Sequence, residues 1–161
     1  MAKELSGPTI SPGDVAEVYS NSAIDIGTRM FDDEGNEYIF MRGVASTVVG
    51  SWVTYDELYD TTLLAANAKG PVAVAMGAHV ANKFGWYQIW GTAIGVCADN
   101  MDDNGVDIGR TGTDGYVGVD PAAGDDIYGA ICRSATEDGS ANTTTTFQIY
   151  YPWVDDNTAA H

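Results

Sequence analysis

The sequence of 161 residues has few basic side chains: 7 lysines and arginines stand against 23 aspartates and glutamates, and the formal net charge is −16. This shortage disfavours nucleic acid as a partner, because phosphate binding depends on Lys and Arg. The negative charge also argues against an anionic membrane surface. No apolar run reaches the roughly 18–20 residues of a membrane-spanning helix, and the first residues show no basic-then-apolar secretion signal. We therefore expect neither nucleic acid nor a membrane as a partner.

Helix-favouring residues are also scarce, with 4 leucines and 3 lysines, whereas threonine (15), valine (14), isoleucine (10) and tyrosine (9) are common. The common residues favour pleated strands. Short β-prone runs recur at a spacing of roughly 8–12 residues, which is typical of a sandwich or barrel. The sequence therefore predicts an all-β fold. A single compact antiparallel β-barrel or sandwich would span residues 24–154, between an extended N-terminal arm (residues 1–23) and a flexible tail (residues 155–161).

Turn signals divide this domain into elements. At most one short helix is expected, in residues 60–70, where Asp60 or Thr61 would cap it and Gly70 would end it. Three hairpins are expected, pairing residues 28–31 with 37–44, 71–79 with 84–93, and 127–133 with 144–151. One face of the run 71–79 carries only Ala73, Ala75, Gly77 and His79. Small residues allow another sheet or subunit to approach such a face closely.

The arm in residues 1–23 is rich in serine, glycine and proline, which favour turns and extended chain. Two interpretations stay open: an arm ordered by contact with another molecule, or a loop lying on its own domain. If it reaches a partner, its contact residues would be Lys3, Pro8, Ile10, Val15 and Tyr19.

Residues that could support catalysis or hold a metal do not form a recognisable motif. The two histidines are His79, inside a run of small residues, and His161, the last residue. Cys97 and Cys132 each lie in an apolar run, which favours two buried thiols over a disulfide. Residues 100–105 partly match a calcium loop, but Thr111 at the twelfth position cannot supply a bidentate carboxylate. We therefore predict no enzymatic activity, no catalytic residue, no cofactor and no metal.

An aromatic stripe remains to be explained. Trp86, Tyr87 and Trp90 lie within five residues. Aromatic side chains on a strand can fill a core, form a subunit interface or stack on sugars, and all three interpretations stay open for this stripe. Further aromatic side chains occur elsewhere in the domain: Trp52, Tyr150, Tyr151 and Trp153.

Six segments of the domain carry a family resemblance. In chain order they are residues 33–38, 50–56, 70–76, 85–91, 124–130 and 146–152. Their sequences are Asp-Glu-Gly-Asn-Glu-Tyr, Gly-Ser-Trp-Val-Thr-Tyr-Asp, Gly-Pro-Val-Ala-Val-Ala-Met, Gly-Trp-Tyr-Gln-Ile-Trp-Gly, Gly-Asp-Asp-Ile-Tyr-Gly-Ala and Thr-Phe-Gln-Ile-Tyr-Tyr-Pro. With these segments the chain resembles the head decoration, or cement, proteins of tailed bacteriophages.

This resemblance implies a non-enzymatic structural protein of β-barrel, β-tulip or jelly-roll type. Such proteins lie on the outer surface of the virion head, often as homotrimers, and clamp neighbouring subunits of the major capsid protein. The segments define no functional residues that can be carried over. The alternative is a carbohydrate-binding or receptor-binding β-sandwich that uses surface tryptophans. It would require Trp86, Trp90 or Trp52 to be exposed.

Overall fold

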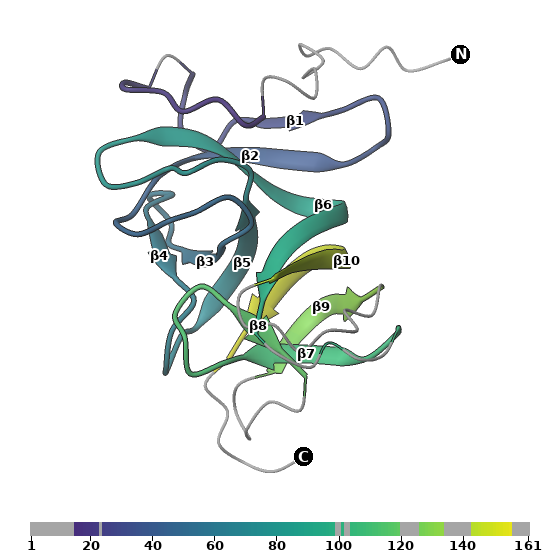
Figure 1. Ribbon diagram of the computed structural model, residues 1–161. Helices are drawn as coiled ribbons and strands as arrows, with labels where there is room; N and C mark the ends of the chain where they lie inside the picture. The colour runs from purple at the N-terminus through teal and green to yellow at the C-terminus, as the bar shows by residue number, and fades with distance from the viewer. Residues whose placement is uncertain are drawn as a thin grey trace.

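The computed structural model describes residues 15–22, 24–98, 101, 104–119, 126–133 and 143–155. The regular secondary structure of these residues consists of β-strands (Figure 1). The strands are β1 (Arg29–Phe31), β2 (Glu37–Arg42), β3 (Trp52–Tyr55), β4 (Thr61–Leu63), β5 (Gly70–Ala75), β6 (Phe84–Cys97), β7 (Asp107–Arg110), β8 (Val117–Gly118), β9 (Asp126–Cys132) and β10 (Thr143–Val154). The described residues include no helix with the length and hydropathy needed to cross a membrane. The predicted all-β class is therefore confirmed.

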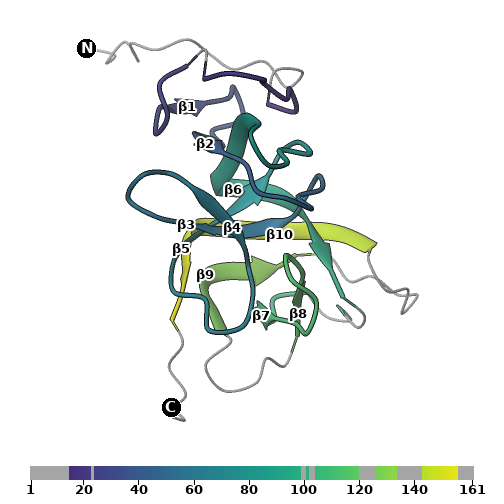
Figure 2. The same cartoon turned by 90° about the vertical axis from the view of Figure 1, so that its left-hand side faces the viewer.

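All ten strands belong to one sheet, in which β6–β8 is the parallel pair and the other pairings are antiparallel. β6, β8, β7, β9 and β10 pair in that order, and β10 pairs again with β6, so these five strands form a closed ring. β1 and β2 lie at one end of the molecule and β7, β8 and β9 at the other, with β6 and β10 between them (Figure 1 and Figure 2). This arrangement agrees with the predicted compact barrel or sandwich.

The long strand β6 connects the two ends. Its first half pairs with β2 and β5, and its second half pairs with β10 from Trp90 to Cys97. Gly91 lies where the partners change and has a φ of 101°. A Cβ at this position would lie 2.1 Å from Asn36 Oδ1, so glycine is required here for both conformation and space.

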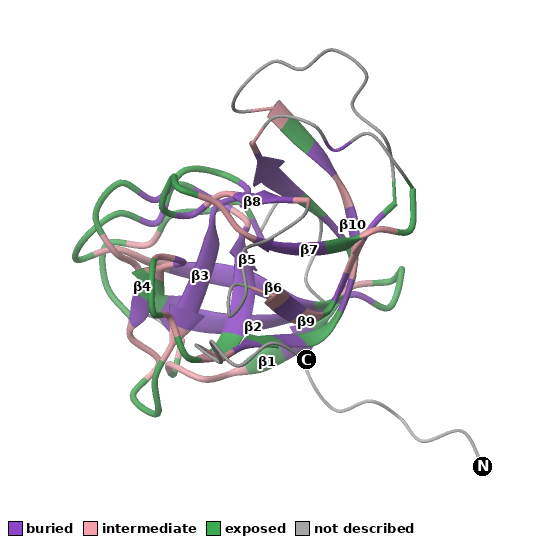
Figure 3. Ribbon diagram, turned by 90° about the horizontal axis from the view of Figure 1, so that it is seen from below, coloured by how far each residue is buried: buried purple, intermediate pink, exposed green. Residues whose placement is uncertain are grey.

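The sheet encloses its apolar side chains in neighbouring clusters (Figure 3). Inside the ring, Trp52 and Phe147 pack edge to face with centroids 5.0 Å apart. β5 contributes side chains to two apolar clusters. Val72 and Val74 belong to the cluster of Trp52 and Phe147, whereas Ala73 and Ala75 pack with residues of β2 and β6. The predicted alternation along this strand is confirmed. Its small-residue face packs against β2, β3 and β6 of the same domain, so of the two alternatives, another part of the fold and not another subunit approaches this face.

The three predicted hairpins are present as β1–β2, β5–β6 and β9–β10. The sequence allowed at most one short helix, in residues 60–70; no helix forms there, and β4 pairs with β3 instead. Two tertiary contacts favour the strand: the Thr61 hydroxyl donates to the carbonyl of Arg42 at 2.7 Å, and Leu64 is buried in the apolar cluster that contains Trp52 and Phe147. A helix of this length gains too little from local propensity to compete with such contacts.

Residues 15–22 lie on their own domain. Tyr19 and Phe84 form an antiparallel bridge, with N–H···O distances of 2.9 and 3.0 Å. Val15 is buried beside Phe40 and Trp86. The interpretation of Val15 as an arm residue that reaches a partner is therefore wrong, and the loop alternative describes residues 15–22. Tyr19 is half-buried, and its predicted contact with a partner stays a prediction. The other predicted arm contacts, Lys3, Pro8 and Ile10, lie outside the described residues, as does the tail beyond Asp155.

The turn between β1 and β2 is organised by Asp32. Its Oδ1 accepts the backbone N–H groups of Glu34 and Asn36 at 3.0 and 2.9 Å. Its Oδ2 accepts the Asn36 side-chain amide at 2.7 Å and the Tyr38 hydroxyl at 2.8 Å. Burial works to raise the pKa of Asp32, but the hydrogen bonds from Asn36 and Tyr38 outweigh it and lower the pKa. Asn36 in turn accepts the Thr92 N–H at 2.9 Å, which ties the turn to β6.

Replacing Asp32 with alanine removes all four of these acceptor contacts. We expect the free energy of unfolding to fall by about 1–3 kcal/mol, since the Asn36 and Tyr38 donors are part-buried and lose a charged partner. Urea unfolding measures this loss. The neighbouring exposed Asp33→Ala is the matched control, with an expected change below about 0.5 kcal/mol. Equal losses in the two variants would contradict the assigned role of Asp32.

Candidate binding surface

Strand β10 changes partners near its end. It pairs with β6 as far as Tyr150, whereas Trp153 and Val154 pair with β5. On the β9 side, the pair Ile149–Ala130 is followed by Trp153–Tyr128, so three residues of β10 lie opposite one residue of β9. That single residue is Gly129, whose φ is 74°. A Cβ on Gly129 would lie 2.8 Å from the Tyr150 carbonyl oxygen, so a side chain there would displace the bulge.

The bulge brings aromatic rings to the surface. Tyr150, Tyr151 and Trp153 are 37, 49 and 46% exposed, and Trp90 on β6 is 36% exposed. Trp90 contacts both Tyr150 and Tyr151, with centroids 4.9 and 5.1 Å apart. Trp153 stacks on Tyr128 of β9 at 4.8 Å. We call these five residues the β10 aromatic surface: Trp90, Tyr128, Tyr150, Tyr151 and Trp153.

Polar contacts hold one end of this surface in place. The Tyr151 hydroxyl donates a short hydrogen bond to Oε2 of Glu37, the buried first residue of β2. Arg29 donates to the other oxygen of Glu37 at 3.5 Å, and its guanidinium lies 5.9 Å from the centre of the Tyr151 ring. The hydrogen bond to Glu37 raises the pKa of Tyr151. The phenol therefore stays a neutral donor, and the exposed ring is fixed rather than free to rotate.

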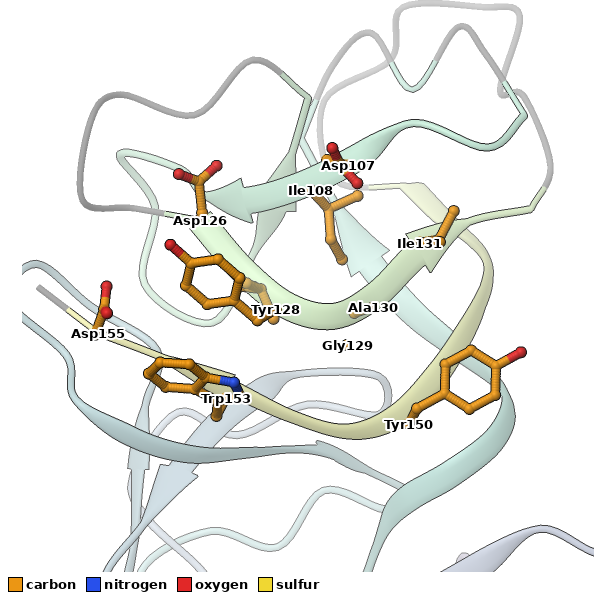
Figure 4. A pocket seen from close by; sticks show the side chains of 11 residues that line it. Asp107, Ile108, Asp126, Tyr128, Gly129, Ala130, Ile131, Tyr150, Trp153 and Asp155 are labelled. Carbon is orange, nitrogen blue, oxygen red and sulfur yellow. The ribbon is translucent and has the colours of Figure 1, made fainter. Parts of the chain in front are cut away.

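A groove of about 670 Å³ lies beside the other end, between β7, β9 and β10 (Figure 4). Its lining includes Asp107, Asp126, Asp155, Ile108, Ile127, Tyr128, Gly129, Ala130, Ile131, Tyr150 and Trp153. Figure 4 shows Asp107 and Asp126 along one side and Trp153 and Tyr150 along the other. Desolvation, together with the charges of Asp155 and Asp126, raises the pKa of Tyr128. The groove thus combines aromatic faces with negative charge, and the described residues that line it include no lysine or arginine.

The structure separates the predicted aromatic stripe into core and surface. Trp86 and Tyr87 are buried, at 2 and 0% exposure, in two different apolar clusters. Their interpretation as interface or ligand aromatics is wrong, because the sheet and the segment at residues 15–22 cover them. Trp90 is partly exposed, so the surface interpretation remains possible for this residue. Trp52 is fully buried and cannot contact a ligand.

Sequence reasoning named Trp90, Tyr150, Tyr151 and Trp153 among the aromatic residues but did not group them on one surface, and it did not name Tyr128. Alternation along a strand predicts that every second side chain is buried, and the bulge shifts that alternation by adding residues. A signal was nevertheless present in the Tyr-Tyr-Pro-Trp run of residues 150–153. Pro152 cannot donate to a ladder, so proline inside a long strand marks an edge or a bulge.

The titratable residues examined from the sequence do not form a reactive centre in the described part of the chain. His79 is fully buried. Cys97 and Cys132 are both buried and not disulfide-bonded, which confirms that prediction. Among the described residues, no three His, Cys, Asp or Glu side chains gather in a way that would hold a metal ion. Asn100, Asp102 and Asp103 of the partial calcium loop lie outside the described residues.

Comparison of the chain with protein-family models, curated proteins and solved structures finds no match. The function is therefore argued from the β10 aromatic surface and the groove themselves.

Proposed function

We propose that this chain is a non-enzymatic structural protein of a tailed-phage head that binds the outer capsid surface. It would act as a homotrimer and stabilise the shell by clamping neighbouring subunits of the major capsid protein. The observation that carries the proposal is the β10 aromatic surface, which presents five rings from three adjacent strands. Aromatic residues are enriched in protein interfaces and dominate their binding energy.

The fixed geometry of this surface supports an interface role. Trp90 is held between two tyrosines, and Tyr151 is tied to Glu37. Side chains ordered before binding lose little entropy when a partner covers them, so more of the buried area appears as affinity. Added interface across capsid subunit boundaries raises the free energy needed to separate those subunits.

The charge distribution supports a position of the protein on the outside of the particle. In the described ion pairs, Arg29–Glu37 and Arg42–Asp60, two of the arginine charges are paired with acids of the same chain. Arg133 donates to Gln148 at 2.8 and 2.7 Å and is also occupied within the fold. The unbalanced acids would give a decorated particle a negative surface, which opposes clumping.

The proposal is tested by adding the purified protein to undecorated heads and locating its density by cryo-electron microscopy. We expect density at symmetry-related positions on the shell and a higher bursting temperature. Trp90→Ala combined with Tyr150→Ala should weaken binding by at least about ten-fold, as expected for central interface aromatics. Leu58→Ala is the matched control, since this side chain is 67% exposed and lies between β3 and β4, neither of which pairs with β10. Heads that stay bare and burst at an unchanged temperature would overturn the proposal.

A second candidate is a carbohydrate-binding or receptor-binding module. It is favoured by the exposure of Trp90 and Trp153, since exposed tryptophans can stack on sugar rings. A glycan array combined with tryptophan fluorescence tests this alternative. Binding that quenches fluorescence in the native protein but not in Trp153→Ala or Trp90→Ala would favour it over the capsid role. An array without hits would remove it.

A further inference from the structure

We infer that the groove between β7, β9 and β10 is a binding site for an arginine side chain presented by an extended segment of a different protein. The inference goes beyond the capsid proposal, because it assigns a ligand chemistry to one groove whatever assembly the protein joins. It is carried by the juxtaposition of the Asp107 and Asp126 carboxylates with the rings of Tyr128 and Trp153 (Figure 4).

Two carboxylates of the groove, those of Asp107 and Asp126, are available to a ligand. Asp107 is exposed and Asp126 is partly exposed, and they come from the adjacent antiparallel strands β7 and β9. Neither forms a salt bridge with another described residue. Since no lysine or arginine is among the described lining residues, the charges of Asp107 and Asp126 create a local negative potential that attracts a cation.

The aromatic side of the groove selects among cations. An arginine guanidinium is planar, stacks on aromatic faces and can donate two parallel hydrogen bonds to a carboxylate. A lysine ammonium is a compact, strongly hydrated charge that matches neither the ring faces nor a pair of carboxylates as well. The buried Ile108 and Ile127 give the groove an apolar base on which an aliphatic side-chain stem can pack.

A second copy of this chain is a poor source of that arginine. The chain has four arginines, and all are engaged within the fold: Arg29 with Glu37, Arg42 with Asp60, Arg110 with the Thr111 carbonyl, and Arg133 with Gln148. Two copies would also bring together net charges of −16 each. Charge complementarity therefore points to a partner of different sequence with basic residues.

The experiment titrates the ¹⁵N-labelled full chain with a blocked seven-residue peptide that carries two arginines separated by glycine and serine. A matched peptide with citrulline in place of arginine keeps the shape and removes the charge. We expect the arginine peptide to shift amide signals of β7, β9 and the end of β10 together with the Trp153 indole N–H. The citrulline peptide should leave them unchanged, and added salt should weaken the arginine peptide's binding.

Two groove variants sharpen the test. Asp107→Asn combined with Asp126→Asn should weaken peptide binding by at least about five-fold, because two charge-assisted contacts are lost. Asp33→Asn combined with Asp114→Asn removes the same charge from exposed positions outside the groove and should leave binding within about two-fold. Trp153→Ala should also weaken binding, whereas Leu58→Ala, at an exposed position outside the groove lining, should not. Melting temperatures identify any variant that has lost its fold, and the two peptides on the native chain remain decisive if one has.

Three outcomes would overturn the inference. The arginine peptide could cause no shifts even at millimolar concentration. The citrulline peptide could bind equally well, which would show that charge does not contribute. Chitooligosaccharides could shift the same amides while the peptide does not, which would make the groove a sugar site. Bare heads in the decoration experiment would overturn the capsid proposal but leave this titration unaffected, so the two failures are distinguishable.

Discussion

Replacing Gly43 with alanine is expected to destabilise the domain by about 3 kcal/mol, near the upper end of the cost of overpacking a well-packed interior. A Cβ at this position would lie 1.8 Å from the carbonyl oxygen of His79 and 2.8 Å from that of Val80. Both clashes are with backbone, so no side-chain rotation relieves them. The Gly43 N–H also donates to the Lys83 carbonyl at 2.7 Å, which holds the two segments together. To relieve the clashes, the backbone of His79 and Val80, which follows β5, would have to move away from residue 43.

Gly112→Ala is the matched control for this substitution. A Cβ at Gly112 meets nothing within 4 Å, and its backbone is not in the left-handed region. We expect its free energy of unfolding to stay within about 0.5 kcal/mol of the native value. For a chain of this length the Gly43 variant should melt about 6–12 °C lower than the native protein. If calorimetry finds the same melting temperature for both variants, the packing described around His79 is wrong.

Acid should destabilise the native protein through His79. The ring is fully buried, and its Nε2 lies 3.1 Å from the Trp86 carbonyl, so Nε2 carries the proton and donates. Nδ1 is buried without a partner. Gly77 and Gly85 leave the space that the ring occupies, since a Cβ on Gly85 would lie 1.9 Å from Cε1. A proton added to Nδ1 would have no acceptor, and burial lowers the pKa of His79 to about 4.

The direction of the pH effect follows from the two pKa values. An unfolded histidine has a pKa of 6.5 and binds a proton more readily than buried His79, whose pKa is about 4. The stability contributed by the neutral ring is therefore complete above pH 6.5 and is lost progressively as the pH falls toward 4. The difference of about 2.5 pKa units corresponds to roughly 3 kcal/mol in total.

Unfolding by urea at several pH values tests this expectation. A His161→Gln background leaves His79 as the one imidazole in the chain. A further His79→Gln substitution should lower stability at neutral pH and flatten its dependence on pH between 6.5 and 4. The many carboxylates titrate in both proteins, so the difference between the two curves isolates His79. Parallel curves would show that the ring is not held neutral.

Sequence patterns predicted those elements that are stabilised by residues close to them in the sequence. The hairpin around Gly35 carries its turn chemistry in Asp32 and Asn36, and β5 carries its two faces in alternating small and branched residues. The strand in residues 61–63 was missed because its stability comes from partners distant in the sequence. Arg42, which accepts from Thr61, is 19 residues away.

The binding surface was predictable only in part for a related reason. Trp86 and Trp90 are separated by four positions, an even number, so alternation alone places both on one side of a strand. In the structure Trp86 is covered by Val15 and Phe40, whereas Trp90 lies beyond a shift in the β2–β6 register, opposite Glu37, and is exposed. Covering segments and bulges are tertiary features. No single-strand pattern contains them, although Pro152 gave a local indication of the bulge in β10.

The closed ring of strands has a consequence for protein synthesis. β10 is the last of the ten strands to be translated, and it pairs with β6, β9 and β5. Until residues 143–154 have left the ribosome, β6 and β9 keep unpaired edges and Phe147 is missing from the ring's interior. Unpaired strand edges on a nascent chain are prone to aggregate. The final folding step must therefore follow translation of β10, and chaperone protection would act on a chain whose first nine strands are already made.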